Sequence, residues 1–278
     1  MRVLITGGTG SFGRAMTQKL LEDGHDVCCL SRGEHAQHDM EILFKMHGHR
    51  FRRFLGDVRD RHRLVRAFAG VDVVIHAAAL KRIEVGRYNP TEVVKTNVDG
   101  SMNVIEAAMD CEVPRVVFLS SDKAYQPVST YGITKALAET LFLNSYPDPG
   151  NKHKTKFVVT RYGNVWKSQG SVVPHWQWLL DQGVRRLPVT DPDATRFFMT
   201  MDEALDLVWT AATQDEIPTS PIIPELPAYR LGDIVAAMSF EMEVIGMKDW
   251  EKKHEGMKDG MTSDVARRMT IDEIRSHL

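Results

Sequence analysis

A tyrosine and a lysine four residues apart form the strongest chemical pattern in this sequence. Tyr131 and Lys135 fall in the segment Tyr-Gly-Ile-Thr-Lys, and in a helix this spacing places both side chains on one face. A lysine ammonium beside a phenol lowers the pKa of the phenol, so a phenolate can accept a hydroxyl proton during hydride transfer. The spacing alone is a common accident, and its meaning depends on the neighbouring segments.

Three polar residues just upstream add groups for proton transfer. Ser121, Asp122 and Lys123 follow an apolar run at residues 116–119 that is typical of a buried strand. Lys123 can act as a general base only when part of it is neutral, so burial and nearby positive charge, such as Lys135, must lower its pKa. Asp122 opposes this, and the pair titrates as a unit. A solvated ion pair on a loop is the alternative interpretation.

A glycine-rich segment near the N-terminus predicts a dinucleotide site. Gly7, Gly10 and Gly13 follow one predicted strand and precede a predicted helix. The first allows a tight turn, the second lets the backbone approach a pyrophosphate, and the third lets the helix pack closely on the strand. Thr9, Ser11 and Phe12 complete the predicted loop. A glycine-rich turn without a ligand is the alternative.

The end of the second predicted strand favours NADP, with NAD as the other possibility. An acidic residue there contacts the ribose of NAD, whereas an arginine accommodates the 2′-phosphate of NADP. This chain has Ser31 and Arg32, with no carboxylate before Glu34. Arg32 as an ordinary solvated residue is the alternative. Further cofactor contacts are predicted after the third and fourth strands, at Asp57, Val58, Ala77 and Ala78.

An α/β fold would bring these segments to one edge of a sheet. Short apolar runs alternate with longer helical patterns, which is typical of a Rossmann-like doubly wound parallel sheet. Strands are predicted at residues 3–6, 27–30, 51–55, 71–76, 116–119 and 157–160, and helices at 12–22, 35–46, 61–68, 90–109 and 130–145. Residues 146–156 are predicted to form a surface loop. A capping-box pattern from Thr270 to Glu273 predicts a last short helix.

Length and composition predict one large core with a smaller lobe attached. The 278 residues are 43% hydrophobic and 26% charged, with a net charge of −2, which indicates an ordinary globular protein with no nucleic-acid or membrane partner. We expect residues 1–165 to form the dinucleotide-binding domain with the catalytic residues, and residues 166–278 to form the smaller C-terminal substrate-binding lobe. The three cysteines show no metal-ligand spacing, which predicts no metal site and a reducing, cytoplasmic location.

Several longer stretches carry a family resemblance. The chain resembles the extended short-chain dehydrogenases/reductases and, among them, the UDP-N-acetylglucosamine 4,6-dehydratases that invert C5. The matching stretches are ITGGTGSFG at residues 5–13, GDVRD at 56–60, HAAALK at 76–81, NPTEVVKTNVDG at 89–100, SSDKA at 120–124, YGITK at 131–135, RYGNV at 161–165, GSVVP at 170–174 and TRFFMT at 195–200. Asp122-Lys123 is the most specific element, because the C5-retaining relatives have Asp-Glu there.

The resemblance implies a reaction that consumes no cofactor. Tyr131 would deprotonate the 4-hydroxyl of the sugar, with Ser121 hydrogen-bonded to that oxygen, while hydride passes from C4 to NADP. Lys123 would remove the C5 proton and Asp122 would protonate the departing 6-hydroxyl. Hydride returns to C6, and protonation of C5 on the opposite face gives the inverted 4-keto-6-deoxy sugar.

The resemblance also implies a UDP-sugar substrate and a set of contacts for it. They are Lys81, Asn164, Ser171, Thr190, Arg196 and Lys248, with Lys81 and Asn97 also placed at the cofactor. Two positions depart from the family pattern, because Gln169 and Lys248 stand where the family has arginines. A lysine does not replace an arginine at a bidentate phosphate contact. Relatives commonly form homo-oligomers through helices in the ranges 90–109 and 130–145, so a homo-oligomer is expected.

Two other functions are compatible with the same fold. A UDP-sugar 4-epimerase needs Tyr131, Lys135 and Ser121 but no base at C5, so Asp122-Lys123 argues against it. A non-catalytic NADP-binding regulatory protein would have no use for Ser121, Tyr131 and Lys135. The sequence therefore favours the dehydratase over both.

Overall fold

A six-stranded parallel sheet forms the centre of the molecule, for which the computed structural model describes residues 1–145 and 154–278. The strands lie in the order β3-β2-β1-β4-β5-β6, which changes direction between β1 and β4. The predicted doubly wound α/β fold is confirmed, and all six predicted strands are present. Their bounds are β1 Arg2–Thr6, β2 Asp26–Ser31, β3 Phe51–Leu55, β4 Val73–His76, β5 Arg115–Ser121 and β6 Lys156–Tyr162.

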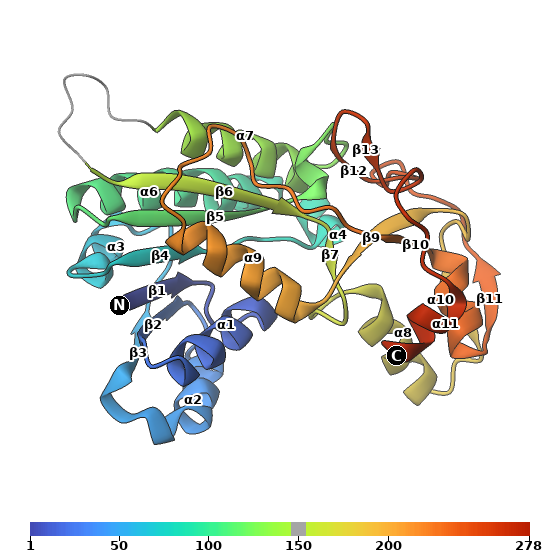
Figure 1. Cartoon of the computed structure of the whole chain (residues 1–278). Helices are drawn as coiled ribbons and strands as arrows, with labels where there is room; N and C mark the ends of the chain where they lie inside the picture. The colour runs from blue at the N-terminus through green and yellow to red at the C-terminus, as the bar shows by residue number, and fades with distance from the viewer. Residues whose placement is uncertain (146–153) are drawn as a thin grey trace.

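Helices cover both faces of this sheet (Figure 1). One face carries α1 (Ser11–Glu22), α2 (Glu34–Leu43) and α9 (Met201–Thr213). The other face carries α3 (Arg61–Phe68), α6 (Gly100–Asp110) and α7 (Thr130–Asn144). The strands inside the sheet are mostly apolar on both sides for this reason, since their side chains meet a helix whichever way they point. Strand β3, at the edge of the sheet, has exposed arginines at Arg52 and Arg53.

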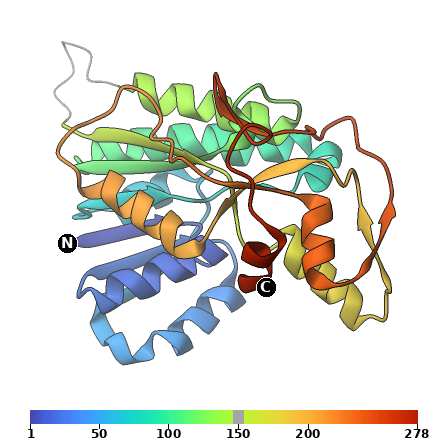
Figure 2. The same ribbon diagram turned by 45° about the vertical axis from the view of Figure 1, so that its right-hand side comes forward.

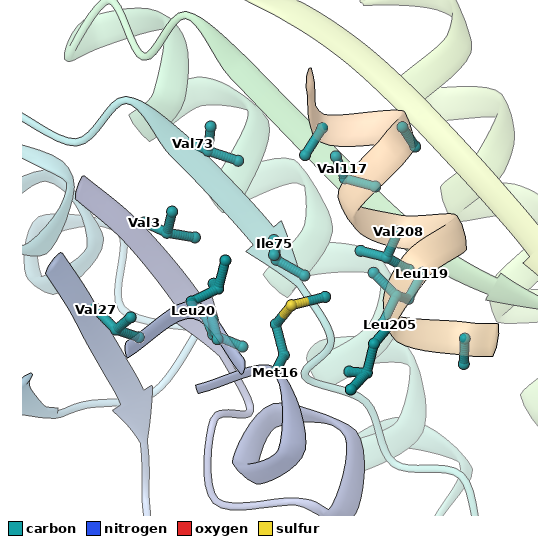
Figure 3. Close-up of a cluster of buried hydrophobic side chains, with 14 of the residues drawn as sticks. Val3, Met16, Leu20, Val27, Val73, Ile75, Val117, Leu119, Leu205 and Val208 are labelled. Carbon is teal, nitrogen blue, oxygen red and sulfur yellow. The ribbon is translucent and has the colours of Figure 1, made fainter. Parts of the chain in front are cut away.

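Helix α9 comes from beyond residue 165 but packs on the first sheet. Figure 3 shows Leu205 and Val208 of α9 against Ile75, Val117 and Leu119, in the same cluster as side chains of β1 and α1. The predicted division at residue 165 therefore follows the order of the chain and not the packing, because α9 covers the part of this face formed by β4 and β5.

The elements from residue 164 onward, apart from α9, form the smaller C-terminal lobe (Figure 2). Its apolar core includes Trp176, Leu187, Phe198, Ile234 and Ile274. Its strands are β7 (Asn164–Val165), β8 (Arg186–Val189), β9 (Thr195–Met199), β10 (Ala228–Arg230), β11 (Glu241–Val244), β12 (Gly256–Lys258) and β13 (Met261–Thr262). Its helices are α8 (Val172–Asp181), α10 (Leu231–Met238) and α11 (Ile271–Ser276). Helix α11 begins with the predicted capping box, in which Thr270 accepts a hydrogen bond from the Glu273 amide.

Three local differences from the predictions concern helices and a loop. The predicted helix 90–109 is divided into α5 (Pro90–Val94), a π-helical turn η2 (Lys95–Asp99) and α6. Helix α4 (Ile83–Tyr88) was not predicted, and residues 45–50 after α2 form the irregular helical turn η1. The predicted loop 146–156 falls mostly on residues 146–153, outside the described residues. Within the described ranges, no helix has the length and apolar character needed to cross a membrane.

Candidate active site

The glycine-rich loop between β1 and α1 leaves no room for a side chain at Gly7 or Gly13. Gly7 has a φ of +69°, and a Cβ there would lie 2.8 Å from the backbone of Ala78 after β4. A Cβ at Gly13 would lie 2.6 Å from the Cα of Gly8, so the start of α1 presses on the turn. Gly10 is the N-terminal residue from which α1 begins. The loop thus has the close turn and bare helix start that a pyrophosphate requires.

The side chains of this loop have different surroundings. Phe12 packs against the apolar core below the sheet. The Ser11 hydroxyl accepts a hydrogen bond of 2.9 Å from the backbone amide of Gln169, which comes from the C-terminal lobe. Thr9 lies half-buried in the turn itself. The segment around Gln169 is therefore joined to the predicted phosphate site by its backbone, although its side chain is not the arginine of the family.

The strand ends at β2 and β3 hold the residues predicted to meet the adenosine. Ser31 is buried and accepts a hydrogen bond from Gln37, whereas Arg32 is half exposed. The Arg32 guanidinium lies 3.8 Å from Asp57. Burial opposes ionisation of Asp57, but hydrogen bonds from Arg59 outweigh it and lower the pKa of this carboxyl. Val58, next to it, is buried against Gly100 and serves packing.

A buried hydrogen-bond network supports the backbone at the end of β4. His76 bonds the Thr6 hydroxyl at 2.7 Å, and the same hydroxyl accepts from the Ala78 amide at 3.3 Å, so it fixes the Ala77-Ala78 segment. Burial lowers the pKa of His76 to about 3, so this ring is neutral.

The side chain of Asn97 links the loop after β4 to α7. Its oxygen accepts from the Leu80 amide at 2.8 Å, and its nitrogen donates to the Leu80 carbonyl and the Thr134 hydroxyl. Asn97 therefore fixes the backbone next to the exposed Lys81.

The end of β5 places an acid and a base side by side. Asp122 is fully buried and begins the short turn η3 (Asp122–Ala124). Its Oδ1 accepts hydrogen bonds from the Ser121 hydroxyl at 2.8 Å and from Lys123 Nζ at 3.0 Å. Lys123 Nζ also donates to Asn164 Oδ1 of β7 at 3.3 Å. Four residues from two of the matched stretches, 120–124 and 161–165, thus meet at one point.

A C-terminal strap, residues 252–259, completes this cluster with a carboxylate that the sequence did not single out. Glu255 is buried, and its Oε1 lies 3.0 Å from Lys123 Nζ. Lys252 Nζ lies 3.1 Å from the other oxygen of Glu255 and donates to the Tyr125 carbonyl at 2.8 Å. Arg196 of β9 approaches Glu255 at 3.9 Å. Only the folded chain reveals this contact, because Glu255 and Lys123 are 132 positions apart.

The charges in this cluster determine the protonation of the pair. Burial raises the pKa of Asp122, and Lys123 only partly offsets that effect. Burial alone would lower the pKa of Lys123, but Asp122 and Glu255 outweigh it and raise the pKa above its usual value. The expected lowering for Lys123 is therefore wrong for the protein chain, because a second carboxylate faces the ammonium.

Tyr131 and Lys135 lie in the first turns of α7, as their spacing predicts. Burial raises the pKa of Tyr131 to about 12, while Lys123 and a hydrogen bond between Tyr131 and Ser121 act in the lowering direction. Lys135 is buried, donates to the Leu119 carbonyl and lies 4.1 Å above the Phe118 ring. Burial lowers the pKa of Lys135 to about 7, against the raising effect of Glu139.

The predicted substrate residues divide into two groups. Asn164 and Arg196 belong to the cluster around Lys123 and Glu255. Lys81 lies exposed on the loop after β4. The other three lie on separate elements of the lobe: Ser171 precedes α8, Thr190 follows β8, and Lys248 lies exposed on the loop after β11. Among the described residues, no hydrogen bond or ion pair joins Lys248 to this cluster, and no group of His, Cys, Asp or Glu is arranged to hold a metal ion.

The fold and this cluster agree with a match between almost the whole chain and a known protein family. Residues 3–275 match the family described as polysaccharide biosynthesis protein. The chain belongs to this family. A family member from Campylobacter jejuni, named UDP-N-acetylglucosamine 4,6-dehydratase (inverting), is 41% identical over 260 residues, covering 92% of this chain and 76% of the relative. A UDP-glucose 4-epimerase from Rickettsia massiliae is 38% identical over 270 residues, with the same two coverages.

Several solved structures share the fold of this chain. Pen from Bacillus thuringiensis superposes with a TM-score of 0.91 at 31% identity, covering 99% of this chain and 96% of Pen. The dTDP-glucose 4,6-dehydratase DesIV from Streptomyces venezuelae, solved with NAD and TYD bound, superposes with a TM-score of 0.83 at 19% identity, covering 100% and 95%. The DesIV similarity is evidence for the fold alone. The relatives from Campylobacter jejuni and Rickettsia massiliae are both named as enzymes of nucleotide sugars, and the solved structures show that this chain shares the fold of Pen and DesIV.

Proposed function

We propose that this protein is an NADP-dependent nucleotide-sugar 4,6-dehydratase that converts UDP-GlcNAc to the C5-inverted 4-keto-6-deoxy sugar. The observation that carries the proposal is the contact between Asp122 and Lys123 at the end of β5, beside Ser121 and Tyr131. Oxidation at C4 needs only the serine and the tyrosine. The additional acid and base have a use if a proton leaves C5 and a hydroxyl leaves C6.

The residues around the glycine loop fit a dinucleotide. The space next to Gly7 and Gly13 is so narrow that a Cβ would collide with backbone, which leaves amide groups free to approach phosphates. Arg32 is half exposed and supports the choice of NADP over NAD. When bound, the cofactor would accept hydride from C4 and return it to C6. Tyr131 and Lys135 would hold its nicotinamide ribose.

Tyr131 and Ser121 would act at the sugar 4-hydroxyl. Ser121 supplies a hydrogen bond to that oxygen, and Tyr131 accepts its proton. The pKa of Tyr131 is about 12 in the chain alone, so nearby positive charge is needed to favour the phenolate. Lys123 already acts in this direction, and Lys135 lies on the same helix one turn away.

Asp122 and Lys123 would carry out the elimination. Burial raises the pKa of Asp122, which favours the protonated acid that the leaving 6-hydroxyl requires. Lys123 must be neutral to accept the C5 proton, and the hydrogen bond of 3.0 Å to Asp122 is a direct path for the lysine proton to move to the carboxylate. After the elimination, Lys123 carries the C5 proton and Asp122 is ionised, and the transfer along the same bond can repeat.

The nucleotide sugar would lie between the sheet edge and the C-terminal lobe. Asn164 and Arg196 are in place beside the acid–base pair. Lys81, Ser171, Thr190 and Lys248 are proposed to contact the sugar or the diphosphate, because cations and hydroxyl groups bind phosphate oxygens well. In this proposal, residues 166–278 supply most of the substrate contacts while α9 remains part of the cofactor domain.

A 4-epimerase is the second candidate, because relatives 38% identical carry that name. Such an enzyme needs Ser121, Tyr131 and Lys135 but has no use for a base at C5. Incubation with UDP-GlcNAc and NADP in heavy water, followed by mass spectrometry and NMR, separates the two functions. Loss of water with deuterium at C5 supports the dehydratase. A C4 epimer without exchange supports the epimerase and refutes the proposal.

Replacement of the base tests the assigned role. The variant Lys123→Ala is expected to bind NADPH as the wild type does but to lose dehydration by about 10²-fold or more, as is typical for a missing general base. Normal dehydration by this variant would show that Lys123 is not the base.

A further inference from the structure

Glu255 faces the ammonium of Lys123 and has no role in the function proposed above. An ammonium has three N–H donors. Three oxygens surround Lys123 Nζ, namely Asp122 Oδ1 at 3.0 Å, Glu255 Oε1 at 3.0 Å and Asn164 Oδ1 at 3.3 Å. Every N–H donor of the ammonium therefore has an acceptor. One of these three contacts must change before Lys123 can accept a proton from another group.

The strap holds Glu255 in this place by several independent contacts. The Glu255 amide donates to the Ser263 hydroxyl at 2.8 Å, and the Ser263 amide donates to the Glu255 carbonyl at 2.7 Å. Arg161, which pairs with Glu139 of α7, also donates to the Met257 carbonyl. The backbone of the strap at Glu255 is thus held by contacts that do not involve Lys123.

We propose that Glu255 is a positioning residue of the dehydratase, which sets the charge state of the Asp122–Lys123 pair through its contact with Lys123 Nζ. The inference rests on the proposed function and extends it to a residue of the C-terminal lobe. Glu255 would orient the amine of Lys123 and stabilise the ammonium that forms when the C5 proton arrives. Lys252 and Arg196 offset the charge of Glu255, so that two carboxylates can lie close together without both attracting protons.

The electrostatics of the cluster support this role. The pKa of Glu255 is lowered to about 2; burial opposes ionisation, but Lys123, Arg196 and Lys252 outweigh it. Glu255 in turn raises the pKa of both Asp122 and Lys123. The charged or titratable groups that face the pair from the packed elements are Glu255 and Lys252 of the strap, Arg196 of β9, Tyr131 of α7 and Tyr229 of β10.

Removal of one negative charge should move both pKa values of the pair in the same direction. Activity requires one proton on the pair, because the acid must hold it and the base must be free. The rate therefore falls at low pH, where a second proton binds, and at high pH, where the last proton leaves. In Glu255→Gln both limbs of the pH–rate profile should shift to lower pH, by about 1 to 3 pH units.

Two further variants test whether the shift of the pH–rate profile depends on charge. Glu255→Asp keeps the charge, so its profile should stay at the wild-type position even if its maximal rate falls. Lys252→Met removes a cation beside Glu255, so both limbs should move to higher pH. Asp259→Asn is the matched control, since Asp259 lies on the same strap but bonds Tyr125 and not Lys123. Its limbs should coincide with those of the wild type.

A merely structural role for Glu255 would lower the maximal rate of Glu255→Gln and leave both limbs in place, and that result would overturn the inference. The charge of Lys123 can also be measured without turnover, by NMR of 15N-lysine-labelled protein with the resonance assigned from its loss in Lys123→Ala. Its titration should move to lower pH in Glu255→Gln and not in Glu255→Asp. An inactive wild type would refute the proposed dehydratase, and the lysine titration would then decide separately whether Glu255 controls this charge.

Discussion

The contact between α7 and the turn η3 makes Gly132 a sensitive point of the active site. Gly132 lies in the first turn of α7 next to Tyr131, and a Cβ there would be 2.4 Å from the carbonyl oxygen of Lys123. We predict that Gly132→Ala separates the helix that carries Tyr131 from the turn that carries Asp122 and Lys123. The variant should fold and bind cofactor, but its catalytic groups should be displaced.

The size of the effect follows from the distance. A comfortable carbon–oxygen contact is about 3.3 Å, so the helix or the turn must move by about 0.9 Å. A misplacement of about 1 Å in an active site costs about 10²-fold in rate, which corresponds to about 2.7 kcal/mol of transition-state stabilisation. The loss should appear mainly in kcat, because the glycine loop that is predicted to hold the pyrophosphate of the cofactor does not lie on α7 or η3.

Single-turnover dehydration of UDP-GlcNAc measures this loss, and fluorescence titration with NADPH measures the affinity for the cofactor. Gly86→Ala is the matched control, because it is also a helical glycine but its Cβ would meet only a methyl group of Val93, at 3.1 Å. The control should retain the wild-type rate. A folded Gly132→Ala variant with a wild-type rate would refute the view that close packing of α7 on η3 aligns the two sets of catalytic groups.

Three other substitutions test the cofactor site, the core and a buried charge. Arg32→Ala should weaken NADPH binding about tenfold, as expected for one charge-assisted hydrogen bond. Fluorescence titration should show an unchanged affinity for NADH. Equal losses of affinity for NADPH and NADH would exclude a contact between Arg32 and the 2′-phosphate. Leu205→Ala in α9 should lower the free energy of unfolding in urea by about 2–5 kcal/mol, whereas an unchanged value would mean that α9 adds little to the sheet core. The pKa of Lys135 is about 7 in the folded chain, compared with 10.5 for an unperturbed lysine. Between these two pH values the unfolded chain binds one more proton than the folded chain, so the stability should rise with pH in this range. Thermal unfolding of Lys135→Met should show a flatter pH dependence, and parallel curves for the two proteins would contradict the shift.

The strands of the sheet could be predicted because strands buried on both faces are short apolar runs in the sequence. The run Val73–His76, for example, is buried at every position, and its first three residues are apolar. The long helix predicted at 90–109 could not be resolved in the same way. Its interruption at η2 coincides with Asn97, whose side chain bonds Leu80 and Thr134 on other elements. π-Helical turns often lie at functional sites and have no clear pattern in the sequence.

The local part of the candidate site could be predicted as a cluster, whereas its long-range part could not. Asp122, Lys123 and Tyr131 lie within ten residues of one another, so a strand end and one helix turn suffice to place them. Glu255 reaches Lys123 only through the fold of the lobe, and a glutamate among several lysines is ordinary on a surface. The pKa of Lys123 could not be judged without it, since the sign of the shift depends on the second carboxylate.

The return of α9 to the first sheet also has a consequence for synthesis on the ribosome. The chain emerges from its N-terminus, and domains generally begin to fold as they appear. The strands up to β6 are complete at residue 162, but the apolar face formed by Ile75, Val117 and Leu119 is covered only when residues 201–213 have followed. During that interval the nascent protein exposes this face, which makes it a binding site for chaperones and a risk for aggregation before the enzyme is finished.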